Sequence, residues 1–228
     1  MEGSKMEISK KTLKIMAGTL SMFLFIILIL LIKNVDVAPV GPQFTAIGLS
    51  SANKAFNDLT GINMFWYYFT QVMGIVAILI VVMFAAIGVL QLIKRRDIRK
   101  VDQCIIAAGC LYAVMLAFYV LFEKVEINYR PVIMPGESLP EASFPSSHTM
   151  LACVVLGSVF LLLPQYIDDR HSGKIIKLVC AVLMALTVFG RLVCGVHWLT
   201  DIIGGVLLSC ALLMFFAAFM KPRREQKK

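Results

Sequence analysis

Charged residues are scarce in this sequence of 228 amino acids, in which Asp, Glu, Lys and Arg together make up 16%. Six runs contain none of the four: 15–32, 59–93, 103–122, 142–167, 178–190 and 202–220. The chain has 59% hydrophobic residues and a mean hydropathy of +0.84, which excludes an ordinary soluble domain, whose apolar share is roughly 45–50%. Because a membrane-spanning helix needs about 20 apolar residues, the sequence predicts an all-α fold, a polytopic membrane helix bundle with six transmembrane helices.

Two of the runs do not have the usual features of a membrane-spanning helix. The first follows basic residues like a signal peptide, but Asp36 stands where a cleavage site needs a small neutral residue, so we expect the run to be retained. The run at 178–190 is short, and Lys174 and Lys177 precede it. Long basic side chains can extend to the membrane surface, so we expect this helix to begin near Gly173.

Cysteine motifs are absent. None of the six cysteines forms a CxxC pair or stands in a cluster with histidines, and all fall in or beside apolar runs. Small buried hydrophobic residues are therefore favoured over disulfides or metal ligands.

The 22 Lys and Arg residues predict the orientation of the bundle. If six spans start from a cytoplasmic N-terminus, 17 of these residues fall in cytoplasmic segments and five remain outside: Lys33, Lys54, Lys124, Arg130 and Arg191. This distribution satisfies the positive-inside rule and places the C-terminus in the cytoplasm as well. Membrane orientation therefore accounts for the net charge of +8, and no nucleic-acid partner is needed.

We expect a single membrane domain over 1–228, with a cytoplasmic leader at 1–14 and an outer surface segment at 35–66. Within that segment, apolar residues recur at helix-like spacing, namely Phe44, Ile47, Ala55 and Leu59. Asn53, Lys54 and Asn57 fall mostly on the opposite side. The pattern predicts a helix lying on the outer surface, and a lid or lipid-entry element is the alternative.

The predicted topology gathers polar residues from three separate stretches at the outer ends of spans three to six. They are Lys124, Arg130, Ser146, Ser147, His148, Arg191, His197 and Asp201. Ionisable residues at the mouth of a span are costly to keep and indicate a functional site. The cations suit a multiply charged anion such as phosphate.

His197 and Asp201 are the centre of this group. Four residues apart on a helix they share one face, so the carboxylate can accept a proton from one ring nitrogen and leave the other basic. That arrangement is typical of an activated nucleophile or base. His148 adds a second titratable group, and Pro145 before Ser146 signals a helix start, where first-turn amides bind anions.

The order of these residues resembles a known signature. Lys124 and Arg130, then Pro145-Ser146-Ser147-His148, then Arg191, His197 and Asp201 are similar to the three motifs of the type 2 phosphatidic acid phosphatase family, membrane lipid phosphatases related to vanadium haloperoxidases. The likeness covers about residues 100–220, which we expect to form the catalytic core. Three positions depart from the family pattern: five residues instead of six separate Lys124 from Arg130, Ser147 replaces a glycine, and Gly190 replaces a serine.

The resemblance implies a metal-independent hydrolysis in two steps, with no cofactor. His197 would attack phosphorus to give a phosphohistidine, with Asp201 holding its tautomer, while His148 would protonate the leaving oxygen and later activate water. The phosphate oxygens would be held by Lys124, Arg130, Ser146, Ser147 and Arg191.

The resemblance also suggests a substrate. Bacterial members of the family look most similar, so the first candidate is undecaprenyl diphosphate, hydrolysed at the outer face of a bacterial plasma membrane. Phosphatidate and phosphatidylglycerol phosphate are the alternatives. Two other kinds of protein also stay open: a lipid phosphotransferase, and a transporter or scaffold whose polar cluster only binds anions. The partners expected are the lipid phosphate substrate and membrane lipids, and the oligomeric state is left open.

Overall fold

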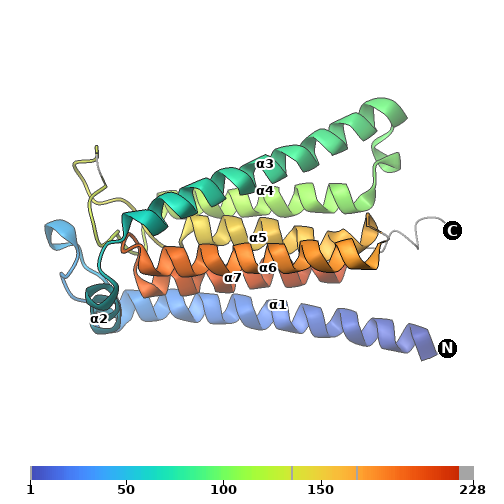
Figure 1. Cartoon of the computed structure of the whole chain (residues 1–228). Coiled ribbons are helices and arrows are strands. Elements are labelled where there is room, and N and C mark those ends of the chain that lie inside the picture. The colour runs from blue at the N-terminus through green and yellow to red at the C-terminus, as the bar shows by residue number, and fades with distance from the viewer. Residues whose placement is uncertain (1, 135, 168, 221–228) are drawn as a thin grey trace.

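A computed structural model describes residues 2–134, 136–167 and 169–220, with side chains from Lys10 onward (Figure 1). The described residues form seven α-helices: α1 (Glu2–Asn34), α2 (Ser50–Thr60), α3 (Met64–Arg95), α4 (Gln103–Lys124), α5 (Ser147–Leu162), α6 (Arg170–Val193) and α7 (Leu199–Phe219). Three short 3₁₀ turns, η1 (Pro42–Phe44), η2 (Ile98–Lys100) and η3 (Leu163–Gln165), lie in the connections.

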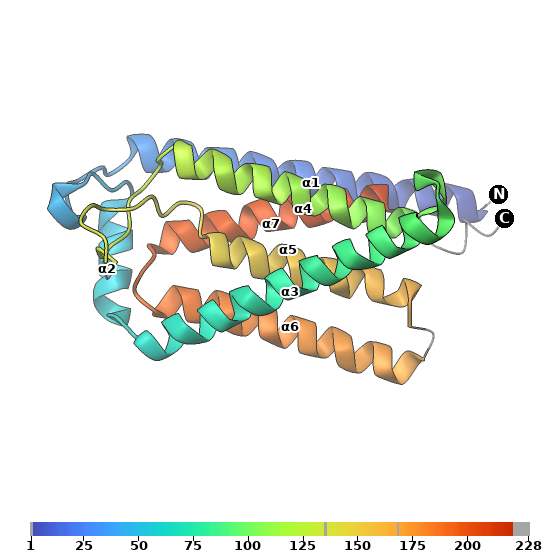
Figure 2. The same ribbon diagram turned by 90° about the horizontal axis from the view of Figure 1, so that it is seen from above.

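Six of the helices, all except α2, are long and apolar enough to cross a membrane. The predicted six-span, all-α architecture is therefore confirmed, and the chain is a multi-pass membrane protein. The fifth span begins at Arg170, slightly before the expected Gly173. With 32 residues, α3 is about 48 Å long, which exceeds the roughly 30 Å hydrocarbon core, so it must tilt. Figure 2 shows it crossing the bundle obliquely.

The two ends of the bundle differ. Figure 1 shows the start of α1 and the end of α7 at one end, and α2 with the connection between α4 and α5 at the other. The described ends of α1 and α7 thus share a side, as six spans require. The C-terminus, which the charge distribution predicts to be cytoplasmic, lies outside the described residues. Which side of the membrane each end faces stays a prediction.

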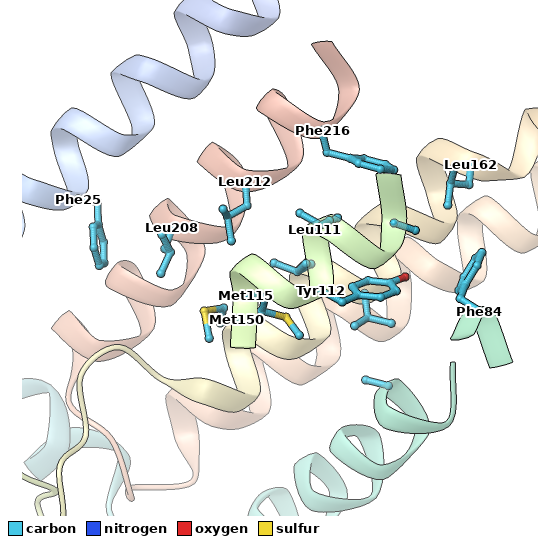
Figure 3. Close-up of a cluster of buried hydrophobic side chains, with 14 of the residues drawn as sticks. Phe25, Phe84, Leu111, Tyr112, Met115, Met150, Leu162, Leu208, Leu212 and Phe216 are labelled. Carbon is cyan, nitrogen blue, oxygen red and sulfur yellow. The ribbon is translucent and has the colours of Figure 1, made fainter. Parts of the chain in front are cut away.

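The apolar core lies where α1, α4, α5 and α7 meet. Figure 3 shows Phe25 of α1 beside Leu208 of α7, with Leu212 and Phe216 further along α7 on the side of α4, which carries Leu111. All five side chains are buried. Removing this apolar area from contact with lipid adds little driving force, so the close fit between helices is what favours this packing.

The cysteines follow the expectation in part. All six are free thiols, and Cys104, Cys153, Cys180 and Cys194 are buried as expected. Cys110 and Cys210 are exposed instead, because they lie on outward faces of α4 and α7.

The surface helix exists, but the predicted division into a polar and an apolar side is wrong in part, since Ile47 is buried and Lys54 exposed as expected and other residues are not. Phe44 and Leu59 are 86% and 82% exposed, whereas Asn53, expected on the polar side, is fully buried. The periodicity was misleading for two reasons. Phe44 belongs to η1, before the helix begins at Ser50, and the Asn53 amide is fully paired inside the fold. Hydrogen bonding, and not hydrophobicity, decides which side of α2 is buried.

Two adjacent glycines let α7 approach the chain before α5. A β-carbon at Gly204 would lie 2.4 Å from the Phe144 ring, and one at Gly205 would lie 3.0 Å from Thr149. Phe144 cannot move aside, because it stacks on Phe25 at 5.6 Å and meets Phe122 edge-on at 6.0 Å. Gly204 therefore sets the spacing between the start of α5 and α7.

Replacing Gly204 by valine should destabilise the protein by about 1–3 kcal/mol, the usual effect of overpacking a dense core. The measurement is the melting temperature in detergent, expected to fall by several degrees. Gly109→Val is the matched control, because a β-carbon at Gly109 meets no atom within 4 Å. Equal melting temperatures for the two variants would contradict the prediction.

Candidate active site

His197 lies in the short connection between α6 and α7, at the α2 end of the bundle. The turn depends on Gly195, whose φ is +77° and where a β-carbon would lie 2.2 Å from the Gly61 carbonyl oxygen. His197 thus precedes α7. The sequence predicted that His197 and Asp201 share a helix, and this is wrong, because α7 begins only at Leu199. The two still face each other, because Asp201 is in the first turn of α7 and its Oδ2 lies 3.4 Å from His197 Nδ1. The same Oδ2 accepts the Trp198 amide at 3.0 Å.

Two guanidinium groups surround the other ring nitrogen of His197. Arg191 Nη2 lies 2.8 Å from His197 Nε2, and Arg130 Nη1 lies 3.5 Å from it. Arginine can only donate hydrogen bonds, so Nε2 must be the acceptor and the ring proton must be on Nδ1. The tautomer therefore has Nδ1–H directed at the Asp201 carboxylate and an unprotonated Nε2.

The charge state of His197 follows from the same surroundings. Its side chain is 3% exposed. Burial, assisted by the positive charges of Arg191 and Arg130, holds the pKa of His197 well below its ordinary value. The imidazole is therefore neutral, and its Nε2 lone pair is available to an electrophile between the two arginines.

Arg191 is positioned by α3, which the sequence did not indicate. Its side chain is 1% exposed, donates to Thr70 Oγ1 at 3.3 Å and lies 5.9 Å from the centre of the Tyr67 ring. Gly190 allows this approach, since a β-carbon there would lie 2.8 Å from Thr70 Cγ2. The glycine that replaces the family serine thus brings a hydroxyl from another helix to Arg191.

Arg130 reaches the same place from the connection between α4 and α5. Its Nε forms an ion pair with Glu141 Oε2 at 2.9 Å, and its amide donates to the Glu141 carbonyl. The Nη1 atom also lies 3.4 Å from the Val196 carbonyl. Glu141 therefore holds Arg130 over the loop that carries His197.

The predicted helix start at Ser146 is confirmed. Ser146 is the N-cap of α5, and its hydroxyl accepts the Thr149 amide. Its own amide donates to the Asp201 carbonyl at 3.0 Å, which ties the start of α5 to the start of α7. The amides of Ser147 and His148, in the first turn, have no acceptor within the helix and form an anion-binding end.

His148 lies where a polar pocket meets an apolar groove. The polar pocket, of about 330 Å³, is lined by both site arginines, by His148 and by Gln71. The apolar groove, of about 690 Å³, lies between α3, α4 and α5 and is lined by Gln71, Ser147 and His148 at one end. Gly74 makes room for the histidine, since a β-carbon there would lie 3.1 Å from His148 Cδ2.

Lys124 is the one predicted site residue that the structure does not bring to the others. It is exposed on the last turn of α4 and lines neither the polar pocket nor the apolar groove. Its neighbour Glu123 lines a third, small cavity of about 20 Å³ that Arg130 and His197 also line. A role for Lys124 in binding phosphate stays a prediction.

A buried amide network supports the first turn of α7. Asn53 of α2 is fully buried, accepts the Thr200 amide at 3.1 Å and donates to Thr200 Oγ1 at 3.0 Å. It also donates to the Gly48 carbonyl at 2.8 Å. Asn128, equally buried, lies 3.5 Å from the same Thr200 hydroxyl. Because Thr200 adjoins Asp201, the surface segment holds the carboxylate that orients His197.

Sequence reasoning missed these supporting residues for different reasons. Glu141 stands in the same connection as Arg130, so the sequence could have indicated an ion pair between the two. Thr70 and Asn53 had none, because they are 121 and 147 residues away from the partners they bind. Contacts over such separations are made only by the fold.

The fold and the cluster define a polytopic membrane protein with a site made of two arginines and two histidines, of which Arg191 and His197 are buried. Residues 124–225 match the PAP2 superfamily, which confirms the resemblance seen in the sequence.

Two relatives extend this comparison. The chain is 33% identical over 99 residues to phosphatidylglycerophosphatase B of Bacillus subtilis (strain 168), an alignment that covers 42% of the chain and 47% of the relative. The chain thus spans about half the length of this curated relative. The fold is similar to the crystal structure of the first transmembrane PAP2 type phosphatidylglycerolphosphate phosphatase from Bacillus subtilis, with a TM-score of 0.60 and 21% identity over 93% of this chain and 98% of that one.

Replacing Asn53 by alanine should lower kcat about tenfold and leave KM nearly unchanged, because small displacements of a catalytic group have large effects on rate. The measurement is steady-state phosphate release together with the melting temperature. Asn57→Ala is the matched control, since Asn57 lies on the same helix, partly buried, and its Oδ1 has no partner among the described residues. An unchanged kcat for the Asn53 variant would show that the network does not position Asp201.

Proposed function

We propose that this protein is a membrane lipid phosphatase that hydrolyses the phosphate of a lipid headgroup through a phosphohistidine at His197. One observation carries the proposal: the unprotonated Nε2 of His197 faces two guanidinium groups, 2.8 and 3.5 Å away, while Nδ1 faces Asp201. A phosphoryl group held between Arg130 and Arg191 would place its phosphorus next to the nucleophile.

In the first step, His197 Nε2 forms a bond to phosphorus as the bond between phosphorus and the lipid oxygen breaks. His148 gives its proton to that leaving oxygen, which is an alcohol for a monophosphate and a lipid phosphate for a diphosphate. The imidazole ring becomes cationic, and the Asp201 carboxylate stabilises the charge through Nδ1–H. The two arginines and the first-turn amides of α5 hold the three remaining phosphoryl oxygens.

In the second step, His148 takes a proton from water, and the resulting oxygen attacks phosphorus. The phosphorus–nitrogen bond breaks, its electron pair returns to His197 Nε2, and inorganic phosphate leaves. His148 ends with the proton that the next cycle requires. No step needs an acceptor other than water, which is what separates this mechanism from phosphotransfer.

The cavities support a lipid as the substrate. The polar pocket holds the charged groups, and the apolar groove opens between α3 and α4, two membrane-spanning helices. Gln71 and His148 line both. A molecule with a charged phosphate and a hydrocarbon chain would fit across this boundary with the phosphate at His148. The excess of basic residues at the opposite end supports a site on the outer face of a bacterial plasma membrane.

Two substrates are specific candidates. Undecaprenyl diphosphate is the candidate drawn from the motifs. Phosphatidylglycerol phosphate is favoured by the identity with phosphatidylglycerophosphatase B over the part of the chain that carries the site.

A single experiment tests the proposal: phosphate release by the purified protein from both lipids and from phosphatidate, with EDTA present and no acceptor added. Release in EDTA supports metal-independent hydrolysis. Absence of release in EDTA together with activity after metal addition would overturn the mechanism, and transfer only to an added acceptor would favour the phosphotransferase.

His197→Ala should abolish phosphate release, by at least about a thousandfold, because the variant lacks the nucleophile. Its melting temperature should stay near that of the unchanged protein. The control is His171→Ala, which removes an exposed histidine at the other end of the bundle. Turnover that survives in the His197 variant would favour a protein that only binds anions or one with another nucleophile.

Arg191→Ala and Lys124→Ala should have very different effects on kcat/KM. Loss of Arg191 removes a guanidinium group 2.8 Å from the nucleophile and should lower kcat/KM by about a hundredfold or more, as for other transition-state donors. Loss of the exposed Lys124 should change it less than about threefold, in line with a surface charge. Steady-state kinetics on one lipid substrate measures both, and a large loss for Lys124→Ala would place that lysine in the site after all.

A further inference from the structure

A second apolar cavity lies in the half of the bundle away from the active site. This distal pocket, of about 370 Å³, is formed by α3, α4 and the η2 turn between them. Its lining includes Phe84, Gly88 and Leu92 of α3 and Ile105, Gly109 and Tyr112 of α4. Apart from Tyr112 every residue that lines it is apolar, so the pocket suits hydrocarbon and not a headgroup.

The distal pocket continues the groove that begins at the active site. Val81 and Tyr112 line both cavities, so the two share a boundary. On α3 the combined lining extends from Gln71 to Leu92, a rise of about 32 Å at roughly 1.5 Å per residue. The hydrocarbon core of a bilayer is about 30 Å thick and one leaflet about half of that. On α4 the lining extends from Ile105 to Tyr119, about 21 Å. Measured along either helix, the continuous groove is therefore longer than one leaflet is thick.

Tyr112 is fixed at the junction of the two cavities. Its hydroxyl lies 2.7 Å from Ser158 Oγ, which itself donates to the Val155 carbonyl at 2.7 Å. Ser158 has one proton to give, so Tyr112 is the donor in their bond. Across the groove its ring meets Phe84, with ring centres 6.2 Å apart, and Figure 3 shows both side chains. Tyr112 is therefore held by contacts with both α5 and α3 at the boundary between the two cavities.

We infer that the distal pocket binds the far part of the substrate's hydrocarbon chain, and that the ligand it fits is a polyprenyl chain longer than one leaflet. This inference rests on the proposed lipid phosphatase function. Starting at His148, an acyl chain of an ordinary glycerophospholipid ends near the middle of the bilayer, at the level of Tyr112. Only a longer chain gains contacts with the distal pocket, so the pocket favours long polyprenyl phosphates over glycerophospholipids.

Gly109→Leu is the test variant. A β-carbon at Gly109 meets no atom within 4 Å, so leucine would occupy the distal pocket without displacing a neighbour. Gly173→Leu is the matched control, because a β-carbon there also meets no atom within 4 Å and the residue, on α6, lines none of these cavities. The substrates are undecaprenyl diphosphate, farnesyl diphosphate and phosphatidate, presented in lipid nanodiscs.

With Gly109→Leu, kcat/KM for undecaprenyl diphosphate should fall at least about tenfold, the loss expected when two or more methylene groups lose apolar contacts. Values for farnesyl diphosphate and phosphatidate should stay within about twofold, as should all values for Gly173→Leu. An equal loss on all three substrates, or no loss on any, would overturn the inference and indicate that bilayer lipid fills the pocket.

The unchanged protein supplies a second measurement in case Gly109→Leu does not fold. Its kcat/KM should rise from farnesyl to undecaprenyl diphosphate by at least about tenfold, and equal values would overturn the inference. Failure of the proposed function gives a different result, because the unchanged protein would then release no phosphate from any of the three lipids.

Discussion

The contact between Arg191 and His197 is the interaction on which the rest of the site depends. A buried guanidinium group 2.8 Å from Nε2 fixes which nitrogen carries the proton, because arginine has no acceptor to offer. It also keeps the imidazole neutral, and it occupies one side of the space that a phosphoryl group would enter. A buried cation next to a histidine is unfavourable by itself, and Thr70 and the Tyr67 ring on α3 partly offset that desolvation. The phosphate of the proposed substrate would supply negative charge next to Arg191 and Arg130.

The first turn of α7 is where the supporting elements meet. Asp201 faces His197 and, through its carbonyl, accepts the Ser146 amide at the start of α5. The adjoining Thr200 is held by Asn53 from the surface segment and by Asn128 from the connection between α4 and α5. The surface segment and both ends of the connection between α4 and α5 thus fix one helix terminus. This explains how a site built mainly from loops at the end of a bundle is positioned as firmly as one built within it.

The membrane gives the two sides of the site different chemistry. The charged groups of the site gather at one end of the bundle, and the groove that starts at His148 runs between the membrane-spanning helices α3, α4 and α5. A lipid phosphate has the same division into a charged head and an apolar chain. A lipid phosphate bound in this way would need no transfer out of the bilayer to reach the proposed nucleophile, and the length of the groove would distinguish one chain from another.

The six spans, their approximate limits and the gathering of Arg130, His148, Arg191, His197 and Asp201 at one end were available from the sequence. Hydrocarbon thickness sets the length of a span, and charge fixes which ends share a side. The spacing of the motifs indicated which of the polar residues at that end belong to the site. The surface helix was found but its buried side was mistaken, because a periodicity of apolar residues does not reveal a buried hydrogen-bonded amide such as Asn53.

The tertiary structure decided which residues touch. It placed Thr70 and Asn53 against partners more than a hundred residues away, left Lys124 outside the two site cavities, and joined the active site to a groove longer than one leaflet is thick. The sequence by itself determined what must lie in the membrane and which chemistry is present, since these follow from the properties of single residues. The tautomer of His197 and the path for a chain depend on distances between helices, and only packing in three dimensions sets those distances.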